Sequence, residues 1–473
     1  MADVTLTIEQ ERALGQLVAV YPVAEELAER IGAAGHELYL VGGTVRDTLL
    51  GSTQHDLDFA TSAPPEETER LLRGWADHVW LTGARFGTVS ALKDGRQLEI
   101  TTFRSDRYLE GSRHPDVTFA DDIDADLVRR DFTINAMAVR LSDQRFVDPF
   151  GGLSDLRDRI LRTPTDPATS FGDDPLRMLR LGRFAAQLSA TPDKATLKAA
   201  EALAPRLDEI SVERIRDELD RLVCAPDQHA GWDLLCDAGL ADRFLPEIPA
   251  LRMERDPLNH HKDVYRHTLA VVQGTPADDV TLRLAALLHD IGKPATRELH
   301  DDGRVTFHHH EVVGARMAKA RLKALRYPKQ VVEDVTQLVF MHLRFHGYVD
   351  GDWTDSAVRR YVNDCGRDEQ LRRLNQLTRA DVTTQNRAKA RRLQRAMDEF
   401  EERIARLREQ EELEQVRPAL DGHQIMQHLG LEPGPLVGEA WSMLREARLE
   451  EGPMSAERAA ELLDAWAEKK GLR

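Results

Sequence analysis

Asp56 and Asp58, which are separated by one residue, have the spacing of a metal-binding pair of carboxylates. On a β-strand, residues i and i+2 project from the same face, so the two carboxylates would converge. Such oxygen ligands suit Mg²⁺, which binds one or two carboxylates together with substrate phosphates. Upstream, Gly42 and Gly43 follow an apolar run, where backbone N–H groups can approach phosphate oxygens without obstruction by Cβ. The pattern predicts a metal-binding strand beside a phosphate-binding turn, with an exposed acidic turn as the alternative.

A second pair, Asp174 and Arg177, lies three positions apart in a segment with helical periodicity, so both side chains share one helix face. Cytosine and adenine present a ring-nitrogen acceptor beside an amine donor, whereas guanine and uracil present a ring N–H beside a carbonyl. One Arg and one Asp can therefore accept the first two bases and reject the others. A structural alternative stays open, because Asp174 before Pro175 is also a good N-cap and the two charges can form a surface ion pair.

The elements that must position these residues change type along the chain. Up to about residue 150, Gly and Asp turns separate short β-rich runs, which predicts a small α/β domain. After Thr163-Pro164 apolar residues recur at intervals of three and four, which predicts helices. Turn-rich breaks mark boundaries within the helical part. The β-rich runs are 37–41, 56–60, 78–82, 87–93, 97–103 and 132–140, and the breaks are 252–257, 350–354 and 432–435.

Length and charge limit the class of protein. The 473 residues predict about three domains. The net charge of minus 17 argues against a protein that coats nucleic acid non-specifically, so a nucleic-acid partner requires a local basic face. Positions 371–397 hold the one candidate, with a solvated helix face as the alternative. Its basic residues are Arg372, Arg373, Arg379, Arg387, Lys389, Arg391, Arg392 and Arg395.

Cysteine usage and hydropathy bear on location. Three cysteines are too few for a disulfide framework, which favours a reducing cytoplasm. We see no signal-peptide pattern and no run near the roughly 20 apolar residues of a membrane helix, so neither secretion nor a membrane partner is expected.

Further motifs follow in a fixed order. They are Arg129-Arg-Asp-Phe-Thr-Ile-Asn-Ala136, Asp148-Pro-Phe-Gly-Gly152, Asp173-Asp-Pro-Leu-Arg-Met-Leu-Arg180 and Ile210-Ser-Val-Glu-Arg-Ile215. Together with the Gly pair and Asp-x-Asp, they resemble the bacterial class II CCA-adding tRNA nucleotidyltransferases of the polymerase-β-like superfamily. The resemblance covers most of the chain. It implies addition of cytidine, cytidine and adenosine to tRNA 3′ ends from CTP and ATP without a nucleic-acid template.

The resemblance also implies residue roles. Two metal ions would activate the attacking 3′-hydroxyl and neutralise the leaving pyrophosphate, with Asp56, Asp58 and Glu99 as catalytic carboxylates and Mg²⁺ as the ion. For Glu99 an exposed strand acid is the alternative. Arg46 and Arg130 look like triphosphate contacts, because guanidinium groups match phosphate oxygens, and Asp131 can accept a ribose hydroxyl; surface ion pairs are the alternative. The implied nucleotide-binding set is Gly42, Gly43, Arg46, Arg130, Asp131, Asp174, Arg177 and Arg180. The family usually has Glu where this chain has Asp173, so the resemblance assigns no role to Asp173.

A second series lies in the middle of the chain, where Asp290-Ile-Gly-Lys-Pro294 follows His289. The series resembles the HD-domain metallophosphohydrolases, which implies one or two divalent ions, with Mn²⁺, Co²⁺ or Ni²⁺ suited to imidazole ligands. His308, His309 and His310 are the three candidates for the third ligand position. His310 is favoured because Glu311 follows it and begins a helical segment. Structural histidines are the alternative. The implied ligands are His267, His289, Asp290, His310, His342 and Asp381.

The expected architecture is an α/β polymerase-β-like head followed by all-α neck, HD and C-terminal helical domains. The expected bounds are 1–150 for the head, 151–250 for the neck with the base-reading helix, 251–385 for the HD domain and 386–473 for the C-terminal body. The HD domain implies a possible phosphohydrolase activity on 2′,3′-cyclic phosphates or phosphomonoesters. The sequence does not predict the oligomeric state.

Three other functions stay open. Bacterial poly(A) polymerase shares the head motifs, although Gly83-Ala-Arg-Phe-Gly-Thr88 and the HD series favour CCA addition. A partial enzyme that adds only CC or only A is the second, and the polar segment 105–126 argues against CC-only addition. A non-catalytic tRNA-binding factor is the third, disfavoured because every expected acid is present. For the tRNA elbow, the basic stretch at 372–395 is the predicted contact.

Overall fold

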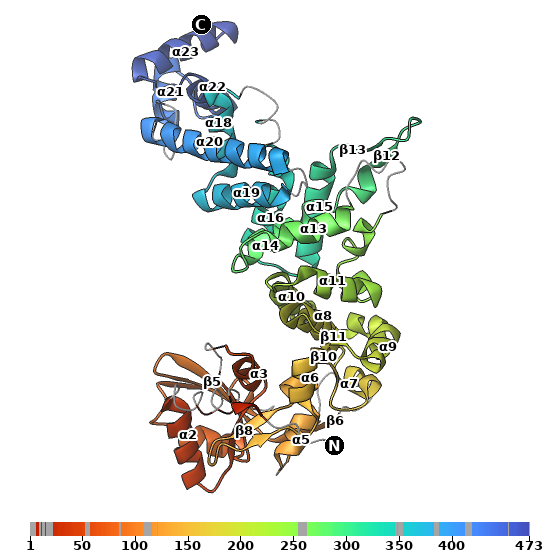
Figure 1. The fold of residues 1–473 in the computed structure, drawn as a ribbon. Helices are drawn as coiled ribbons and strands as arrows, with labels where there is room; N and C mark the ends of the chain where they lie inside the picture. Colours follow the sequence, from red (N-terminus) through yellow and green to blue (C-terminus); the bar gives the residue numbers. More distant parts are fainter. Residues whose placement is uncertain are drawn as a thin grey trace. The chain divides into compact units, whose positions relative to one another are not determined.

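The computed structural model describes residues 6–8, 11, 15, 22–52, 57–84, 87–107, 116–120, 122–253, 263–345, 348, 353–382, 387–411, 419–452 and 454–472. The chain forms two compact units, Met1–Pro249 and Ala250–Arg473 (Figure 1). Within the described ranges, no helix is both long and apolar enough to cross a membrane.

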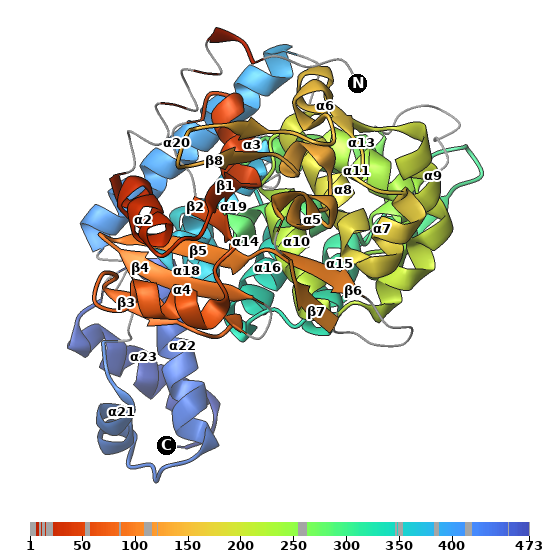
Figure 2. The same ribbon diagram turned by 90° about the horizontal axis from the view of Figure 1, so that it is seen from below.

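A seven-stranded mixed sheet organises the first unit, in the order β3-β4-β5-β2-β1-β8-β9 (Figure 2). Strands β2 and β5 pair in parallel, whereas the other neighbours pair antiparallel. Strand β1, which lies between β2 and β8, is buried at every residue, as its apolar sequence requires. The strands are β1 Leu38–Val41, β2 Leu57–Thr61, β3 His78–Trp80, β4 Thr88–Lys93, β5 Arg96–Thr102, β8 Ala138–Arg140 and β9 Phe146–Val147.

Helices α2 Pro22–Ala33, α3 Gly43–Leu49, α4 Pro65–Leu72 and α5 Ile123–Val128 pack on this sheet, and β6 Arg104–Arg107 pairs with β7 Asp116–Phe119. The predicted strand over 132–140 is wrong in its first half. Thr133–Asn135 forms a 3₁₀ turn instead, because the Asn135 side chain is held by Asp131 and Arg46.

A set of helices, here named the neck helices, follows the sheet within the same unit. Helix α8 packs on both α10 and α11. A Cβ atom on Gly182 would lie 2.5 Å from the Leu235 side chain, so α8 and α11 approach closely only because glycine is present. The neck helices are α6 Gly152–Asp158, α7 Pro167–Asp173, α8 Leu176–Leu188, α9 Lys194–Leu203, α10 Val212–Val223, α11 Gln228–Asp237 and α12 Ala241–Phe244.

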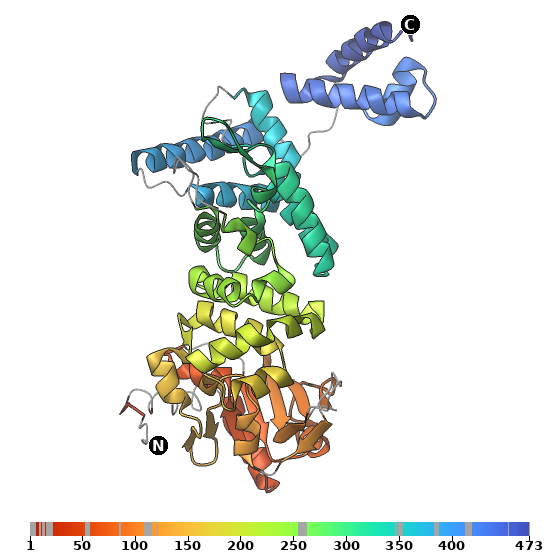
Figure 3. The same cartoon turned by 90° about the vertical axis from the view of Figure 1, so that its right-hand side faces the viewer.

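The second unit is almost entirely helical, with one hairpin of β12 Arg297–Leu299 and β13 Val305–Phe307. Its first helices are α13 Val264–Gln273, α14 Val280–Leu288, α15 His310–Ala324, α16 Lys329–Met341, α18 Asp355–Cys365, α19 Asp368–Asp381 and α20 Arg387–Glu411. Three more, α21 Gly422–Leu429, α22 Pro435–Glu451 and α23 Ala456–Lys469, surround their own apolar core and appear in blue in Figure 3.

Candidate active site

One cleft of about 960 Å³ in the first unit contains all eight predicted nucleotide-binding residues and one of the predicted catalytic carboxylates. They come from the turn before α3, helix α3 itself, strand β2, the segment 129–135, the link between α7 and α8, and helix α8. The predicted residues that line the cleft are Gly42, Gly43, Arg46, Asp58, Arg130, Asp131, Asp174, Arg177 and Arg180. Asp56 lies outside the described residues, and Glu99 is not part of the lining.

Asp58 and Glu99 are register partners on the parallel strands β2 and β5. Paired residues on adjacent strands project from the same face, so both carboxylates lie on the cleft side of the sheet. The Asp58 N–H donates a 3.2 Å hydrogen bond to Thr44 Oγ1, which connects strand β2 to the start of α3. Glu99 is exposed at the surface. The donor set is therefore carboxylate oxygen, which suits a hard divalent cation.

Arg130 lies against the glycine pair. Gly42 has φ of 66°, and a Cβ there would lie 2.7 Å from Arg130 Nη1. The fully buried Asp126 orients the arginine by accepting hydrogen bonds from its Nε at 3.2 Å and its Nη2 at 2.9 Å, and it also binds Arg129. Burial raises the pKa of Asp126, but the charges of Arg130 and Arg129 outweigh that effect and hold the pKa below its ordinary value. An ionised carboxylate thus fixes two guanidinium groups beside the turn.

Asp131 is engaged by protein groups at both oxygens. Its Oδ1 accepts from Asn135 Nδ2 at 2.9 Å and from the Phe132 N–H at 2.8 Å, and its Oδ2 accepts from Arg180 Nε at 2.6 Å. Burial alone would raise the pKa of Asp131, but the charge of Arg180 and these hydrogen bonds lower it far below the ordinary value. Asn135 Oδ1 in turn accepts from Arg46 Nη1 at 2.6 Å. Two predicted nucleotide contacts, Asp131 and Arg180, therefore bind each other.

Asp174 and Arg177 are both held by other residues. Asp174 Oδ1 accepts a hydrogen bond from the Leu176 N–H at 3.2 Å, so Asp174 makes the helix-capping contact that the sequence suggested as the structural alternative. Its Oδ2 lies 2.9 Å from Arg214 Nη2, so the alternative ion pair with Arg177 is wrong. Arg177 Nη1 donates to Ser170 Oγ at 2.7 Å, and its Nη2 donates to the Arg129 carbonyl.

Sequence reasoning missed part of the cleft. Phe184 lies beneath three guanidinium groups, whose Cζ atoms are 4.3 Å (Arg183), 5.0 Å (Arg46) and 5.6 Å (Arg180) from its ring centroid. Arg183 Nε lies 3.3 Å from Glu218 Oε2, and burial together with the Arg180 charge lowers the pKa of Arg183 to about 10. The sequence contained a signal for Phe184. Positions 177, 180, 184 and 187 are spaced by three and four residues, which predicts that Phe184 shares a helix face with Arg177 and Arg180.

A second site lies in the second unit, where helix ends from distant parts of the sequence meet. Asp290 is the centre: its Oδ2 lies 3.1 Å from His289 Nε2 and 3.6 Å from His267 Nε2, and its Oδ1 lies 3.4 Å from His310 Nε2 and 3.9 Å from His342 Nε2. Asp381 Oδ1 lies 2.9 Å from His267 Nε2. His310 is buried here, whereas His308 and His309 are exposed, so only the predicted member of that triplet joins the cluster.

The tautomers of these histidines follow from their backbone contacts. Nδ1 of His289, His310 and His342 lies 2.7, 2.8 and 2.6 Å from the carbonyl oxygens of Ala286, Phe307 and Val339, so each Nδ1 carries the proton and donates. Each Nε2 is buried, has no hydrogen-bond partner and presents a lone pair to the others. Orphaned imidazole nitrogens around a carboxylate fit a divalent metal ion.

The ligand atoms form two groups that share Asp290. One contains His267 and His289, and the other contains His310 and His342, with the atoms of each group within 4.8 Å of one another. Burial and the neighbouring His289 lower the pKa of His342 to about 4. The pKa of Asp290 lies well below its ordinary value, because a protonated His289 and the Lys293 ammonium outweigh the effect of burial; metal binding would require His289 to lose that proton. A neutral imidazole and an ionised carboxylate are the forms that bind metal.

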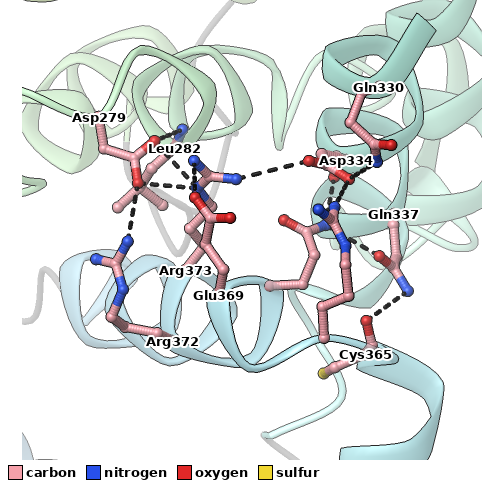
Figure 4. A network of polar contacts seen from close by, with 11 residues as sticks. Asp279, Leu282, Gln330, Asp334, Gln337, Cys365, Glu369, Arg372 and Arg373 are labelled. Atoms are coloured by element: carbon pink, nitrogen blue, oxygen red, sulfur yellow. Dashed lines mark hydrogen bonds and ion pairs between the residues drawn. The ribbon is translucent and has the colours of Figure 1, made fainter.

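A network of ion pairs fixes the helix that carries Asp381. Arg373 on α19 contacts Asp279 Oδ2 at 2.8 Å and Asp334 Oδ2 at 3.6 Å, and Arg372 contacts Asp279 at 3.4 Å (Figure 4). Asp279 caps α14 and Asp334 lies on α16, so these contacts join α19 to the helices that precede His289 and His342. These ion pairs neutralise Arg372 and Arg373, so the predicted basic face has less free positive charge than the sequence suggested. Arg391, Arg392 and Arg395 are exposed.

Comparisons with known proteins place this geometry in a family. Residues 38–162 match the "Poly A polymerase head domain", 191–251 match the "Probable RNA and SrmB-binding site of polymerase A", and 258–386 match the HD domain. The chain is 35% identical over 444 residues to the A-adding tRNA nucleotidyltransferase of Deinococcus radiodurans, covering 91% of this chain and 95% of the relative. The chain belongs to the bacterial tRNA nucleotidyltransferase family with a fused HD domain. The predicted family and fold class are confirmed.

Other relatives match over a shorter length. The CCA-adding enzyme of Streptococcus gordonii is 42% identical over 246 residues, which is 52% of this chain and 60% of that enzyme. The chain thus spans about 60% of the length of such relatives. The Bacillus stearothermophilus CCA-adding enzyme in complex with CTP has a similar fold, with a TM-score of 0.72, 24% identity and coverage of 95% and 98% of the two chains.

Proposed function

We propose that this protein adds cytidine, cytidine and adenosine to the 3′ end of tRNA, from CTP and ATP and without a nucleic-acid template. One observation carries the proposal: a single cleft contains the Asp58 carboxylate, a glycine turn with guanidinium groups, and Asp174 and Arg177 at the start of helix α8. These groups match the three parts of a nucleoside triphosphate, namely the reacting phosphate, the phosphate tail and the base.

At the reacting phosphate, Asp56, Asp58 and Glu99 would hold Mg²⁺. The bound ions would supply the charge that activates the 3′-hydroxyl and neutralises pyrophosphate. The register of Asp58 with Glu99 and its hydrogen bond to Thr44 at the start of α3 support this role. The protein's own part is to hold the carboxylates on one face before the substrate arrives.

For the phosphate tail, the glycine turn leads into the N-terminus of α3, which begins at Gly43 and whose partial positive charge favours anions. Arg46 and Arg130 add guanidinium charge, and both are pre-oriented, by Asn135 and by Asp126. The two members of the Asp131–Arg180 pair would have different roles. Arg180 would contact phosphate, and Asp131 would accept a hydrogen bond from a ribose hydroxyl with its remaining lone pairs.

For the base, Asp174 would accept from the exocyclic amine of cytosine or adenine, and Arg177 would donate to the adjacent ring nitrogen. Uracil and guanine present the opposite pattern, so each would leave two groups unpaired.

The test uses tRNA that lacks its 3′ end by three, two or one nucleotides, each incubated with Mg²⁺ and one labelled nucleotide at a time. We expect CTP to be used on the first two substrates and ATP on the third. Repeated addition of A to an unrelated RNA would indicate a poly(A) polymerase instead, and binding without addition would indicate a non-catalytic factor.

A-only addition is a second candidate, favoured by one observation. The relative that matches 95% of its own length to this chain is an A-adding enzyme. The same substrates separate the two activities: an A-adding enzyme would use only tRNA that already ends in CC and would incorporate no CTP.

For the second site we propose a metal-dependent phosphohydrolase activity on 2′,3′-cyclic phosphates or phosphomonoesters. His267, His289, Asp290, His310, His342 and Asp381 would hold one or two ions of the Mn²⁺, Co²⁺ or Ni²⁺ type, since imidazole nitrogen favours such metals over Mg²⁺. The orphaned Nε2 atoms support this. Hydrolysis of a cyclic nucleotide with each metal in turn is the test.

We also propose the domain bounds 1–150, 151–250, 251–385 and 386–473 for head, neck, HD domain and body. Their separate expression with proteolysis would check them. A cytoplasmic location completes the proposal, and none of the three cysteines forms a disulfide bond in the structure.

A further inference from the structure

Arg177 is anchored by a residue that lies behind it. The side chain lines the cleft, but Ser170, which accepts a 2.7 Å hydrogen bond from its Nη1, does not. Nη2 donates to the Arg129 carbonyl at the same time. Two of the three guanidinium nitrogens are therefore engaged by Ser170 and Arg129, which holds the group in one orientation.

Ser170 is suited to this task by its own surroundings. It is fully buried within α7, a helix that begins after the N-cap Asp166 with Pro167 in its first turn. Its carbonyl also accepts the Asp174 N–H at 3.3 Å, so the same residue contacts both members of the Asp–Arg pair. A buried hydroxyl on a helix has little freedom, and it transmits that rigidity to a long side chain that otherwise samples many rotamers.

The orientation of Arg177 matters because uracil and guanine carry a carbonyl next to the ring N–H. A mobile guanidinium can turn and donate to that carbonyl, which would reward the wrong base. A guanidinium held at two nitrogens cannot follow it, so the wrong base leaves its groups unpaired.

We infer that Ser170 is a specificity-determining positioning residue, which fixes the Arg177 guanidinium so that the cleft rejects UTP and GTP. The inference rests on the proposed role of Arg177 in reading the base.

The experiment is a double-mutant cycle of Ser170→Ala and Arg177→Ala in the full chain. Two ratios are measured: kcat/KM for CTP against UTP on tRNA that lacks its 3′ end, and the affinity for CTP against UTP by calorimetry. Thr169→Ala is the matched control, because its hydroxyl lies one residue away on α7 but donates to Asp166 at 3.2 Å. Melting temperatures confirm that each variant is folded.

We expect Ser170→Ala to lower both ratios about tenfold, as the loss of one hydrogen bond to a charged group predicts. It should lower them no further in the Arg177→Ala background, since it acts through Arg177. Thr169→Ala should match the wild type. Unchanged ratios in Ser170→Ala, or an equal loss in the Arg177→Ala background, would overturn the inference. A wild-type protein that binds CTP selectively but adds nothing would contradict the proposed function alone.

Discussion

Arg180 on α8 donates a 2.6 Å hydrogen bond from its Nε to Asp131 Oδ2, which joins a neck helix to the segment that follows α5. Asp131 retains 7% side-chain exposure and Arg180 retains 31%. The pair therefore links the segment that carries Arg130 to the helix that carries Arg177, so the proposed nucleotide binding and the stability of the first unit would depend on the same contact.

Replacing Arg180 with Met should destabilise the first unit by about 3 kcal/mol, because it leaves a buried carboxylate without its cation. The double change with Asp131→Asn should recover most of that loss. Urea unfolding followed by a probe in the first unit measures both. Equal stability of Arg180→Met and wild type would show that the buried Asp131 carboxylate does not depend on Arg180 for its stabilisation.

The pH dependence follows from the lowered pKa of Asp131. In the unfolded chain an Asp has a pKa of about 3.9, so as the pH falls Asp131 takes up a proton in the unfolded state before it does so in the folded state. The stability from this pair is thus fully present above that pH and is lost as pH falls below it toward the folded pKa. Asp131→Asn should flatten the acid limb of the stability curve measured between about pH 5 and 2. An unchanged limb would show that other carboxylates set it.

Asp58→Ala should abolish nucleotide addition and leave the protein folded. The change deletes a metal ligand and relieves repulsion between carboxylates that share one face, so the melting temperature should hold or rise. Glu66→Ala, an exposed acid on α4, is the control and should retain full activity. Wild-type turnover by Asp58→Ala with Mg²⁺ would exclude this strand as the metal site.

Asp174→Ala should weaken selection of CTP and ATP over UTP and GTP more than it weakens triphosphate binding, because the phosphate contacts lie elsewhere in the cleft. Asp208→Ala removes an exposed ion pair with Arg243 and serves as the control. Pyrophosphate inhibition reports on the phosphate contacts and should change little. If nucleotide preference stays the same, Asp174 is only the cap seen at Leu176.

His289→Ala combined with Asp290→Ala should abolish binding of Mn²⁺, Co²⁺ or Ni²⁺ to the second unit, and with it any hydrolysis of 2′,3′-cyclic nucleotides. Nucleotide addition with Mg²⁺ should be largely retained, since the two sites use different ligands in different units. His308→Ala with His309→Ala, both exposed, is the matched control. Calorimetric metal binding and activity are measured together. Metal binding that survives the first double change would return these histidines to a structural role.

Short apolar runs between turns were enough to predict the strands of the sheet. The helical interval between Asp174 and Arg177 was only partly correct, because both residues line the cleft but Asp174 lies in extended backbone between α7 and α8 and only Arg177 is on α8. Family motifs in order predicted the cleft lining, because such motifs fix residue types at the ends of particular strands and helices. Within 132–140 the same reasoning failed, since the 3₁₀ turn depends on Asn135 reaching Asp131 and Arg46.

Only the tertiary structure decided which distant side chains meet. Asp174 binds Arg214, Arg180 binds Asp131, and Ser170 anchors Arg177, although local spacing favoured an Asp174–Arg177 pair. Likewise, the sequence offered three adjacent histidines, and helix packing buried His310 while leaving its neighbours exposed. The physical reason is that such contacts depend on where whole helices pack. That packing is set by many weak contacts, such as the close approach at Gly182, and no local pattern encodes it.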